Sequence, residues 1–234
     1  MASKNKLIRY PSIEVQALFE KEQALIEQVK ASQLDQVLLL WQAKVPTLVL
    51  PAGNKWSLSD ELVQSLAQTG WALTARKTGG APVPQLLGII NLSHIYHWPD
   101  DLPYDIKTAY LNLCGVLKTF FQSIGVTVEV HATPGSYCDG DYNLNIAGQK
   151  IVGTAQRVLL KKQGGKVVLS QACIIIDADV EKLVEPVKLC NQICHHSAQI
   201  EANVHTTLYS HMDERPSVEV LFRQLTEAFL YHSK

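Results

Sequence analysis

The stretch "YNLNIAGQKIVGTAQRVLLKKQGGKVVLSQACIII", residues 142–176, determines the fold that we expect. Three apolar segments within it are separated by two turns, one around Gly148 and one at Gly164-Gly165. Apolar runs joined by short glycine-containing loops are typical of antiparallel strands. The stretch therefore predicts a strand meander.

Strands and helices alternate along the rest of the chain. Apolar runs predict strands at residues 36–42, 46–51, 71–76, 86–97 and 126–132. Helical spacing predicts helices that begin near Ser12, Ser59 and Pro103, and two more at 179–195 and 217–231. This order indicates an α/β (α+β) fold with a mixed, largely antiparallel sheet and packed helices. No repeat or linker divides the chain, so we expect residues 1–234 to form one domain without an accessory C-terminal domain.

The bulk composition excludes several classes of function. The chain is 47% hydrophobic, 18% charged and has a formal net charge of -1, which gives no global reason to bind nucleic acid or a membrane surface. No apolar run approaches the roughly 18 residues of a membrane span, and the N-terminus lacks a signal pattern. Five cysteines without disulfide-framework spacing predict a reducing, cytoplasmic location.

One of these cysteines, Cys138, lies in an unusual place. Cys114 and Cys173 have the apolar neighbours of a buried structural cysteine, whereas Cys138 lies in the polar turn "GSYCDGD". A free thiol is only ~3% ionised at pH 7, and a nearby cation increases that fraction. Lys150 follows the turn around Gly148 and is a candidate for that cation; its ammonium group also suits a substrate carbonyl. The spacing by itself also fits, and slightly favours, a simpler interpretation in which Cys138 is an exposed loop cysteine and Lys150 a solvated hairpin lysine.

The residues around this pair carry a resemblance. "GSYCDGDYNLNIAGQKIVGTAQR", residues 135–157, resembles the biotin/lipoate protein ligase and octanoyltransferase superfamily, most closely its lipoyl/octanoyl-[H protein] amidotransferase branch. That branch has the pattern Gly-Ser-Tyr-Cys-x-Gly-x-Tyr-x-Leu followed by Gly-x-Lys-[hydrophobic]-x-Gly. The matching positions are Gly135, Ser136, Tyr137, Cys138, Gly140, Tyr142, Leu144, Gly148, Lys150 and Gly153.

A second motif, "RKTGGAPVPQLLGIINLS" at residues 76–93, resembles the Arg-Arg-x-Ser-Gly-Gly-x-x-Val loop of the same family, with Lys77 in place of the second arginine. Glycines allow a ligand to approach the backbone, and basic residues bind polar groups. "LLLWQAKVPTLVLPAG" resembles the family's early tryptophan-containing strand pair. The resemblance implies a class II aminoacyl-tRNA synthetase/biotin ligase-like domain. It also implies substrate binding by Arg76, Lys77, Thr78, Gly79, Gly80, Asn91, Gly153 and Thr154.

The resemblance further implies a reaction. In the family branch the cysteine carries the acyl group as a thioester and the lysine beside it lowers its pKa, which assigns these roles to Cys138 and Lys150. We therefore expect an acyltransferase of protein lipoylation. The donor would be an acylated glycine-cleavage H protein or an acyl carrier protein, and the acceptor a lysine of a lipoyl domain.

Two alternatives stay open at this point. The first is an ATP-dependent lipoate ligase, which would need ATP and Mg²⁺, whereas the transferase needs no cofactor. Such ligases have a His-Asp pair where this chain has Pro84-Gln85, which argues against adenylate formation. The second alternative is a non-catalytic protein that binds the acyl or lipoyl group.

The remaining candidates carry weaker signals. Cys190 and Cys194, followed by His195 and His196, lack a full zinc ligand set, so we expect no metal site. His205 and His211 are expected at the surface, and His131 to be polar filler at a strand end. The pair Lys161-Lys162 is expected in a solvated turn, where it could contact an acidic carrier domain.

Overall fold

The meander predicted from residues 142–176 is present in the computed structural model, which describes residues 4–162 and 164–232. Its strands are β8 (Leu144–Ile146), β9 (Gln149–Leu160) and β10 (Lys166–Ile175), paired antiparallel in that order. Ala147 and Gly148 connect β8 to β9 with φ values of 48° and 80°. Two consecutive positive φ angles are the geometry of a two-residue hairpin turn that matches the twist of the strands.

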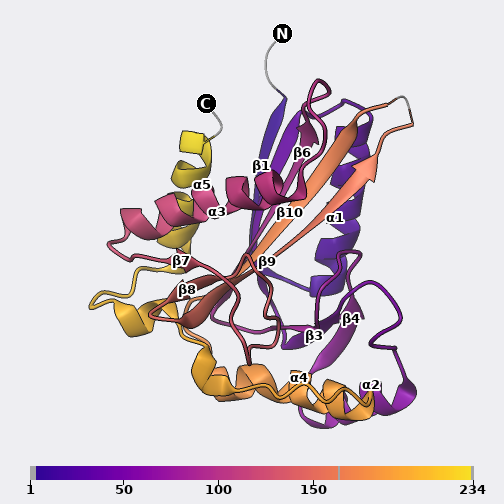
Figure 1. Ribbon diagram of the computed structural model, residues 1–234, viewed down its shortest axis with the longest axis vertical. Helices are drawn as coiled ribbons and strands as arrows, with labels where there is room; N and C mark the ends of the chain where they lie inside the picture. The colour runs from indigo at the N-terminus through magenta and orange to yellow at the C-terminus, as the bar shows by residue number, and fades with distance from the viewer. Residues whose placement is uncertain (1–3, 163, 233–234) are drawn as a thin grey trace.

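The meander is part of a seven-stranded mixed sheet (Figure 1). The strand order is β1-β2-β6-β10-β9-β8-β7. The further strands are β1 (Asn5–Ile13), β2 (Gln36–Ala43), β6 (Ile89–Trp98) and β7 (Glu129–Val130). β1 and β2 run parallel, and the other neighbours in the sheet are antiparallel. The mixed, largely antiparallel sheet expected from the sequence is therefore confirmed.

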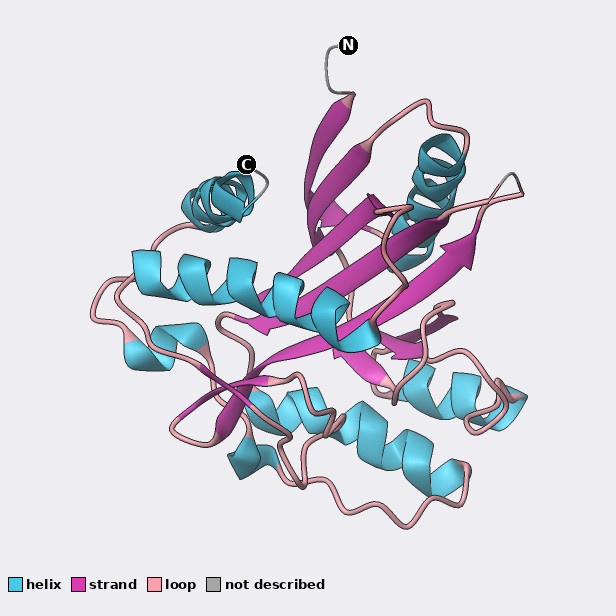
Figure 2. Cartoon of the chain, turned by 45° about the horizontal axis from the view of Figure 1, so that its top comes forward, coloured by secondary structure: helices cyan, strands magenta, loops and turns pink. Residues whose placement is uncertain are grey.

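Helices cover both faces of this sheet. Helix α1 (Val15–Lys30) packs on one face, while α3 (Ile106–Ser123) and α5 (Val218–His232) pack on the other, with α3 lying across the strands (Figure 2). The alternation within β2 explains the two cores: Leu38 and Leu40 face α3 and α5, and their neighbours in sequence face α1. Successive side chains of a strand point to opposite faces, so one apolar strand serves two cores.

A second, three-stranded sheet lies beside the first. Its order is β4-β3-β5, from β4 (Ala72–Ala75), β3 (Thr47–Leu50) and β5 (Val83–Gln85). Helices α2 (Asp60–Gln68) and α4 (Val180–Ile193) pack against it. The short helices η1 (Ala202–Val204) and η2 (Leu208–His211) lead from α4 towards α5. None of the helices in the described ranges has the length and apolarity that a membrane-spanning helix needs.

The predicted helix starts were wrong at two places. Ser12 belongs to β1, a strand that the sequence did not predict, and α1 begins at Val15 without a side-chain cap. Helix α3 begins at Ile106, not at Pro103, because the Asp105 carboxylate accepts the Thr108 N–H and caps the helix there.

One predicted strand, one predicted strand pair and one predicted loop also differ from the structure. The strand expected at 126–132 is reduced to the two residues of β7, because Val126 and Val128 are buried in the α3/α5 core rather than paired in a sheet. The segment 46–51 does form a strand, but it pairs in the second sheet and not with β2. Val83 and Pro84, expected in the glycine-containing loop 77–84, belong instead to β5 and pair with β3.

Candidate active site

The loop between β7 and β8 carries Cys138 and is held by hydrogen bonds to the Cys138 carbonyl oxygen. Three donors converge on this oxygen: Ser136 Oγ at 2.8 Å, Asn143 Nδ2 at 2.8 Å and Lys150 Nζ at 2.5 Å. One hydroxyl, one amide and one ammonium on a single acceptor fix the backbone at Cys138. The thiol side chain itself is partly buried.

Lys150 reaches this carbonyl from β9 and is fully buried, with 0% exposure. Its Nζ lies 4.0 Å from the centroid of the Tyr137 ring, within the range of a cation–π interaction. Burial lowers the pKa of Lys150 to about 8, and the neighbouring thiols Cys138 and Cys173 oppose that shift. A Cβ atom at Gly153 would lie 3.4 Å from Lys150 Nζ, so this glycine leaves space for the ammonium group.

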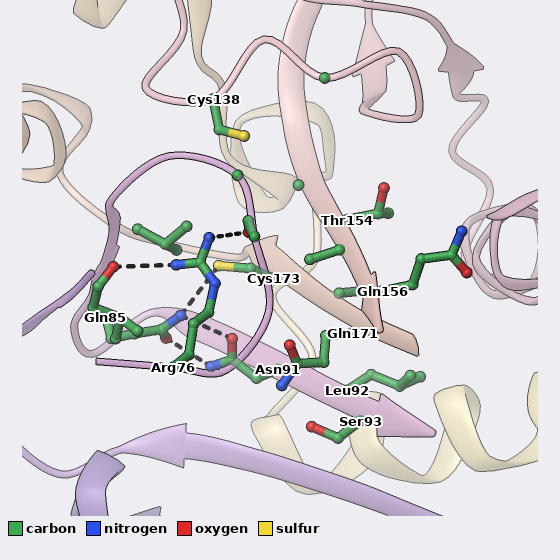
Figure 3. Close-up of a pocket in the computed structure, with 18 of the residues that line it drawn as sticks. Arg76, Gln85, Asn91, Leu92, Ser93, Cys138, Thr154, Gln156, Gln171 and Cys173 are labelled. Atoms are coloured by element: carbon green, nitrogen blue, oxygen red, sulfur yellow. Dashed lines mark hydrogen bonds between the residues drawn. The ribbon is translucent and has the colours of Figure 1, made fainter. Parts of the chain in front are cut away.

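Cys138 and Lys150 both border a cavity of about 270 Å³ between the sheets. Cys138 enters it from the loop and Cys173 from β10 (Figure 3). The charged residues that line it are Arg76 and Lys150; among the described residues that line it, none carries a carboxylate. The apolar part of the lining consists mainly of Phe19, Trp41, Val49, Val83 and Leu92. An apolar cavity that contains two cations favours a ligand with an apolar body and a carbonyl or anionic head.

Arg76 is held by backbone carbonyls of the glycine-containing loop. Its guanidinium donates to Val49 O at 3.1 Å, Gly79 O at 2.8 Å and Ala81 O at 2.8 Å. Gly80 follows with φ = 106°, and a Cβ there would lie 3.8 Å from the Cys138 sulfur. The second motif therefore places its cation and its glycine backbone next to the thiol.

Gln85 and Asn91 form a reciprocal amide pair in the cavity (Figure 3). Gln85 Nε2 donates to Asn91 Oδ1 at 3.0 Å, and Asn91 Nδ2 donates to Gln85 Oε1 at 2.7 Å. Gln85 Nε2 also lies 3.6 Å from Cys173 Sγ. Burial raises the pKa of Cys173 to about 11, so this thiol stays protonated at neutral pH.

The structure brings together most of the predicted binding residues. Those that line the cavity are Arg76, Gly79, Gly80, Asn91, Gly153 and Thr154. Lys77 and Thr78 lie outside this lining. The exposed Lys77 Nζ donates to Gln23 at 3.0 Å, and the buried Thr78 hydroxyl donates to Gln171 Oε1 at 3.0 Å.

The prediction for His205 was wrong. It was expected at the surface together with His211, but only 2% of His205 is exposed, whereas His211 is exposed as predicted. His205 lies beside Tyr137 and pairs with Lys150 in an isolated parallel bridge. No local pattern marks it, because its burial depends on a segment far from the motif in sequence. His131 is partly buried, and its Nδ1 lies 2.8 Å from the adjacent carbonyl of Ala132.

The two other clusters lie outside the cavity. Cys190 is buried on α4 and Cys194 caps the end of the same helix, followed by His195 and His196. Among the described residues, no group of three or more His, Cys, Asp or Glu side chains is arranged to hold a metal ion. The pair Lys161-Lys162 lies at the β9–β10 turn, at a different surface depression.

The geometry suits nucleophilic chemistry at a carbonyl. A thiol at the edge of an apolar cavity, beside a buried ammonium group, can form a covalent bond to an acyl carbon, and the ammonium group can stabilise the charge that develops on the acyl oxygen. The cavity volume is close to the lower end of small-ligand pockets, about 300 Å³.

Comparisons with known proteins agree with this description. The octanoyl-[GcvH]:protein N-octanoyltransferase of Geobacillus kaustophilus is 29% identical over 164 residues, which cover 70% of this chain and 56% of that protein. The lipoyl-[GcvH]:protein N-lipoyltransferase of Listeria monocytogenes is 30% identical over 121 residues, which cover 51% of this chain and 41% of that protein. The chain thus spans about half the length of the curated relatives it matches.

A comparison of three-dimensional structures finds the same fold at low sequence identity. The crystal structure of lipoate-protein ligase A bound with ATP superposes with a TM-score of 0.75, covers 99% of this chain and 86% of that one, and shares 15% identity. The profile of the lipoyl protein ligase A/B catalytic domain matches residues 15–230. The resemblance drawn from the two motifs is confirmed, and the chain belongs to the lipoyl protein ligase A/B catalytic domain family.

Proposed function

We propose that this chain is an acyltransferase of protein lipoylation, which moves an octanoyl or lipoyl group from a donor protein to a lysine of a lipoyl domain. The observation that carries the proposal is the position of Cys138 and Lys150 at the edge of one apolar cavity, where the Lys150 ammonium group donates a hydrogen bond to the Cys138 carbonyl oxygen. The names of the relatives, N-octanoyltransferase and N-lipoyltransferase, support the same class of reaction.

In the first half-reaction the Cys138 thiolate attacks the carbonyl carbon of the acylated donor. A C–S bond forms, the bond from the acyl carbon to the donor breaks, and the leaving group of the donor takes up a proton. Lys150 stabilises the negative charge that develops on the carbonyl oxygen, for which it has to turn from the Cys138 carbonyl towards the substrate. The product is a Cys138 thioester.

In the second half-reaction the amine of the acceptor lysine attacks the thioester carbonyl. A C–N bond forms, the C–S bond breaks, and the amine loses a proton as the thiolate leaves. Because a thiolate is a better leaving group than an amine, the second transfer proceeds to the amide. The cysteine therefore divides one difficult transfer between proteins into two easier ones.

We propose the H protein as the donor, because the names of both relatives contain [GcvH]. An acyl carrier protein is the second donor to test. We further propose that the reaction needs neither ATP nor Mg²⁺, since the acyl group arrives already linked to a carrier. A cytoplasmic location stays a prediction from cysteine spacing.

The deciding experiment is intact mass spectrometry after the chain is mixed with octanoylated H protein, without nucleotide. We expect the wild-type chain to gain the mass of one octanoyl group on Cys138, in a bond that hydroxylamine cleaves, and to lose it when an unmodified lipoyl domain is added. Cys138→Ser is the matched control and should stay at its unmodified mass. Octanoylated acyl carrier protein, in a parallel sample, identifies the donor.

Two outcomes would contradict the proposal. A wild-type chain that binds the donor but never gains mass would indicate a non-catalytic binding protein. Release of pyrophosphate on incubation with lipoate, Mg²⁺ and ATP, with equal rates for wild type and Cys138→Ser, would indicate a lipoate ligase.

A further inference from the structure

A segment late in the chain, residues 201–206, packs against both parts of the candidate active site. The Glu201 N–H donates to Gly135 O at 2.9 Å, and the Thr206 N–H donates to Lys150 O at 2.9 Å. The first bond is to the loop that carries the thiol, and the second is to the strand that carries the ammonium group. The segment therefore holds these two elements next to each other.

His205 lies within this segment, and its hydrogen bonds define its tautomer. Its Nδ1 is 3.0 Å from Glu201 O and 3.3 Å from Ala202 O. Carbonyl oxygens only accept hydrogen bonds, so Nδ1 carries the hydrogen and Nε2 is the acceptor. The Tyr137 N–H donates to Nε2 at 3.4 Å. Burial, together with the Lys150 charge, lowers the pKa of His205 to about 4, which keeps the ring neutral.

The imidazole ring also stacks on the side chain of Tyr137. The two ring centroids are 5.0 Å apart and the planes differ by 3°. The same Tyr137 ring lies 4.0 Å from Lys150 Nζ. Tyr137 is thus connected to the ammonium group through its ring and to Cys138 through the peptide bond, so a movement of Tyr137 displaces both groups.

We infer that His205 is a positioning residue: its Nε2 accepts the Tyr137 N–H and so holds the backbone of Tyr137, which in turn sets the places of the Cys138 thiol and the Lys150 ammonium group. Its part in transfer rests on the proposed function, but the geometry can be tested without any acyl group. Loss of the acceptor leaves a buried N–H without a bond, and the loop then moves to satisfy it.

Two substitutions separate the acceptor from the ring. His205→Phe keeps an aromatic ring for the Tyr137 stack but removes the acceptor. His205→Gln removes the ring but can place a side-chain oxygen near the Nε2 position. Asn203→Ala changes an exposed side chain of the same segment and is the control. Thermal unfolding of each variant shows whether it is folded.

The first readout is the rate at which iodoacetamide alkylates Cys138, followed by peptide mass. The second is the dependence of octanoyl transfer on the concentration of octanoylated H protein. For His205→Phe we expect alkylation and kcat to fall by at least about tenfold, while KM changes less than about threefold, because misplacement of a reacting group by about 1 Å can cost 100-fold in rate. His205→Gln should recover both rates to within about threefold of wild type, since a hydrogen-bond acceptor is restored.

The inference is overturned if a folded His205→Phe variant retains wild-type rates, or if His205→Gln loses as much as His205→Phe. Nitrogen-15 NMR of the wild-type imidazole provides a test that needs no variant: we expect a protonated Nδ1 and an unprotonated Nε2, and the opposite tautomer would contradict the inference. A wild-type chain that fails to transfer octanoate would contradict the proposed function, whereas the alkylation and NMR results would still decide the role of His205.

Discussion

Cys138 and Cys173 line the same cavity, but they belong to regions of different character. Cys173 lies near the end of β10, paired with Gly153 on one side and Asn91 on the other, and is 8% exposed. Cys138 lies in a loop, and three of the hydrogen bonds that hold this loop end on its carbonyl oxygen. The strand fixes a thiol by burying it, whereas the loop fixes the backbone and leaves the thiol at the edge of the cavity.

This difference shows why a thiol in a cavity is not by itself a nucleophile. Burial raises the pKa of Cys173 to about 11, so very little thiolate is present at neutral pH. The polar side chains around the Cys138 loop permit partial exposure, and the ammonium group of Lys150 reaches the same loop. The comparison therefore supports the proposal that the loop carries the chemistry and the strand contributes packing, and each of the following experiments can contradict that division.

The largest effect is expected from Cys138→Ser. Transfer of octanoate should fall by at least about 1000-fold, because a serine hydroxyl without a general base is a much weaker nucleophile than a thiolate. Cys173→Ala should still accept one octanoyl group, on Cys138, by peptide mass. If the acyl group is found on Cys173 in the wild-type chain, the assignment is reversed.

The next largest effect is expected from Lys150→Met, with opposite signs for activity and stability. The acylation rate should fall by about 100-fold or more, because the charge on the acyl oxygen loses its stabilising donor. The midpoint of urea unfolding at pH 7 should stay the same or rise, since a buried ammonium group is costly and the Cys138 carbonyl keeps two other donors.

The same variant tests the ionisation of Lys150. Its pKa is lowered to about 8 in the folded chain from an ordinary value of 10.5, so the unfolded chain binds more protons between these values. The contribution of Lys150 to the free energy of unfolding should therefore become more favourable as the pH rises from about 8 to 10.5. The difference between wild type and Lys150→Met, measured by urea unfolding across this range, isolates this group. A pH-independent difference would contradict its burial as an ammonium ion.

A smaller effect is expected at the glycine next to the Cys138 sulfur. Gly80 has φ = 106°, and a Cβ there would lie 3.2 Å from Arg76 Nη2 and 3.8 Å from the sulfur; Gly53 has φ = 107° with no neighbour within 4 Å. Alanine at either position should lower the free energy of unfolding by about 1–2 kcal/mol, from the strained backbone. Only Gly80→Ala should also slow acylation, by roughly tenfold, because it displaces groups at the cavity. Equal activities of the two variants would show that the loop tolerates displacement.

The smallest effect is expected on the free energy of unfolding when Cys173 or Cys138 is replaced by alanine. Cys173→Ala should lower the free energy of unfolding by about 1 kcal/mol, because it leaves a small void in a buried strand. Cys138→Ala should change it by less than about 0.5 kcal/mol, as for partly exposed loop positions. Chemical denaturation of both variants provides the values, and the reverse order would contradict the comparison.

The features that the sequence predicted well depend on local signals. The β8–β9 hairpin needs only Ala147-Gly148 between two apolar runs, and this turn brings Lys150 back to the Cys138 loop. The glycine loop after Arg76 is likewise continuous in sequence. The sequence did not predict that the two basic side chains point in opposite directions. The Arg76 side chain points into the cavity, whereas the Lys77 side chain points outward and contacts Gln23.

The features that the sequence did not predict depend on contacts between distant segments. β1 exists because Asn5 to Tyr10 pair in parallel with residues 36–41, and a parallel pair has no hairpin to mark it. His205 lies in a polar connection, and only the packing of that connection onto the loop and β9 makes it a buried group. The single-domain organisation of residues 1–234 stays a prediction.

The attachment of residues 201–206 to the Cys138 loop and to β9 has a consequence for biosynthesis. While the chain emerges from the ribosome, the thiol and the lysine appear well before the segment that aligns them. A nascent polypeptide that ends before His205 would carry every residue of both sequence motifs and still lack the alignment on which acyl transfer depends. Under the proposed function, competence for acyl transfer would then arise only after residues 201–206 have been synthesised.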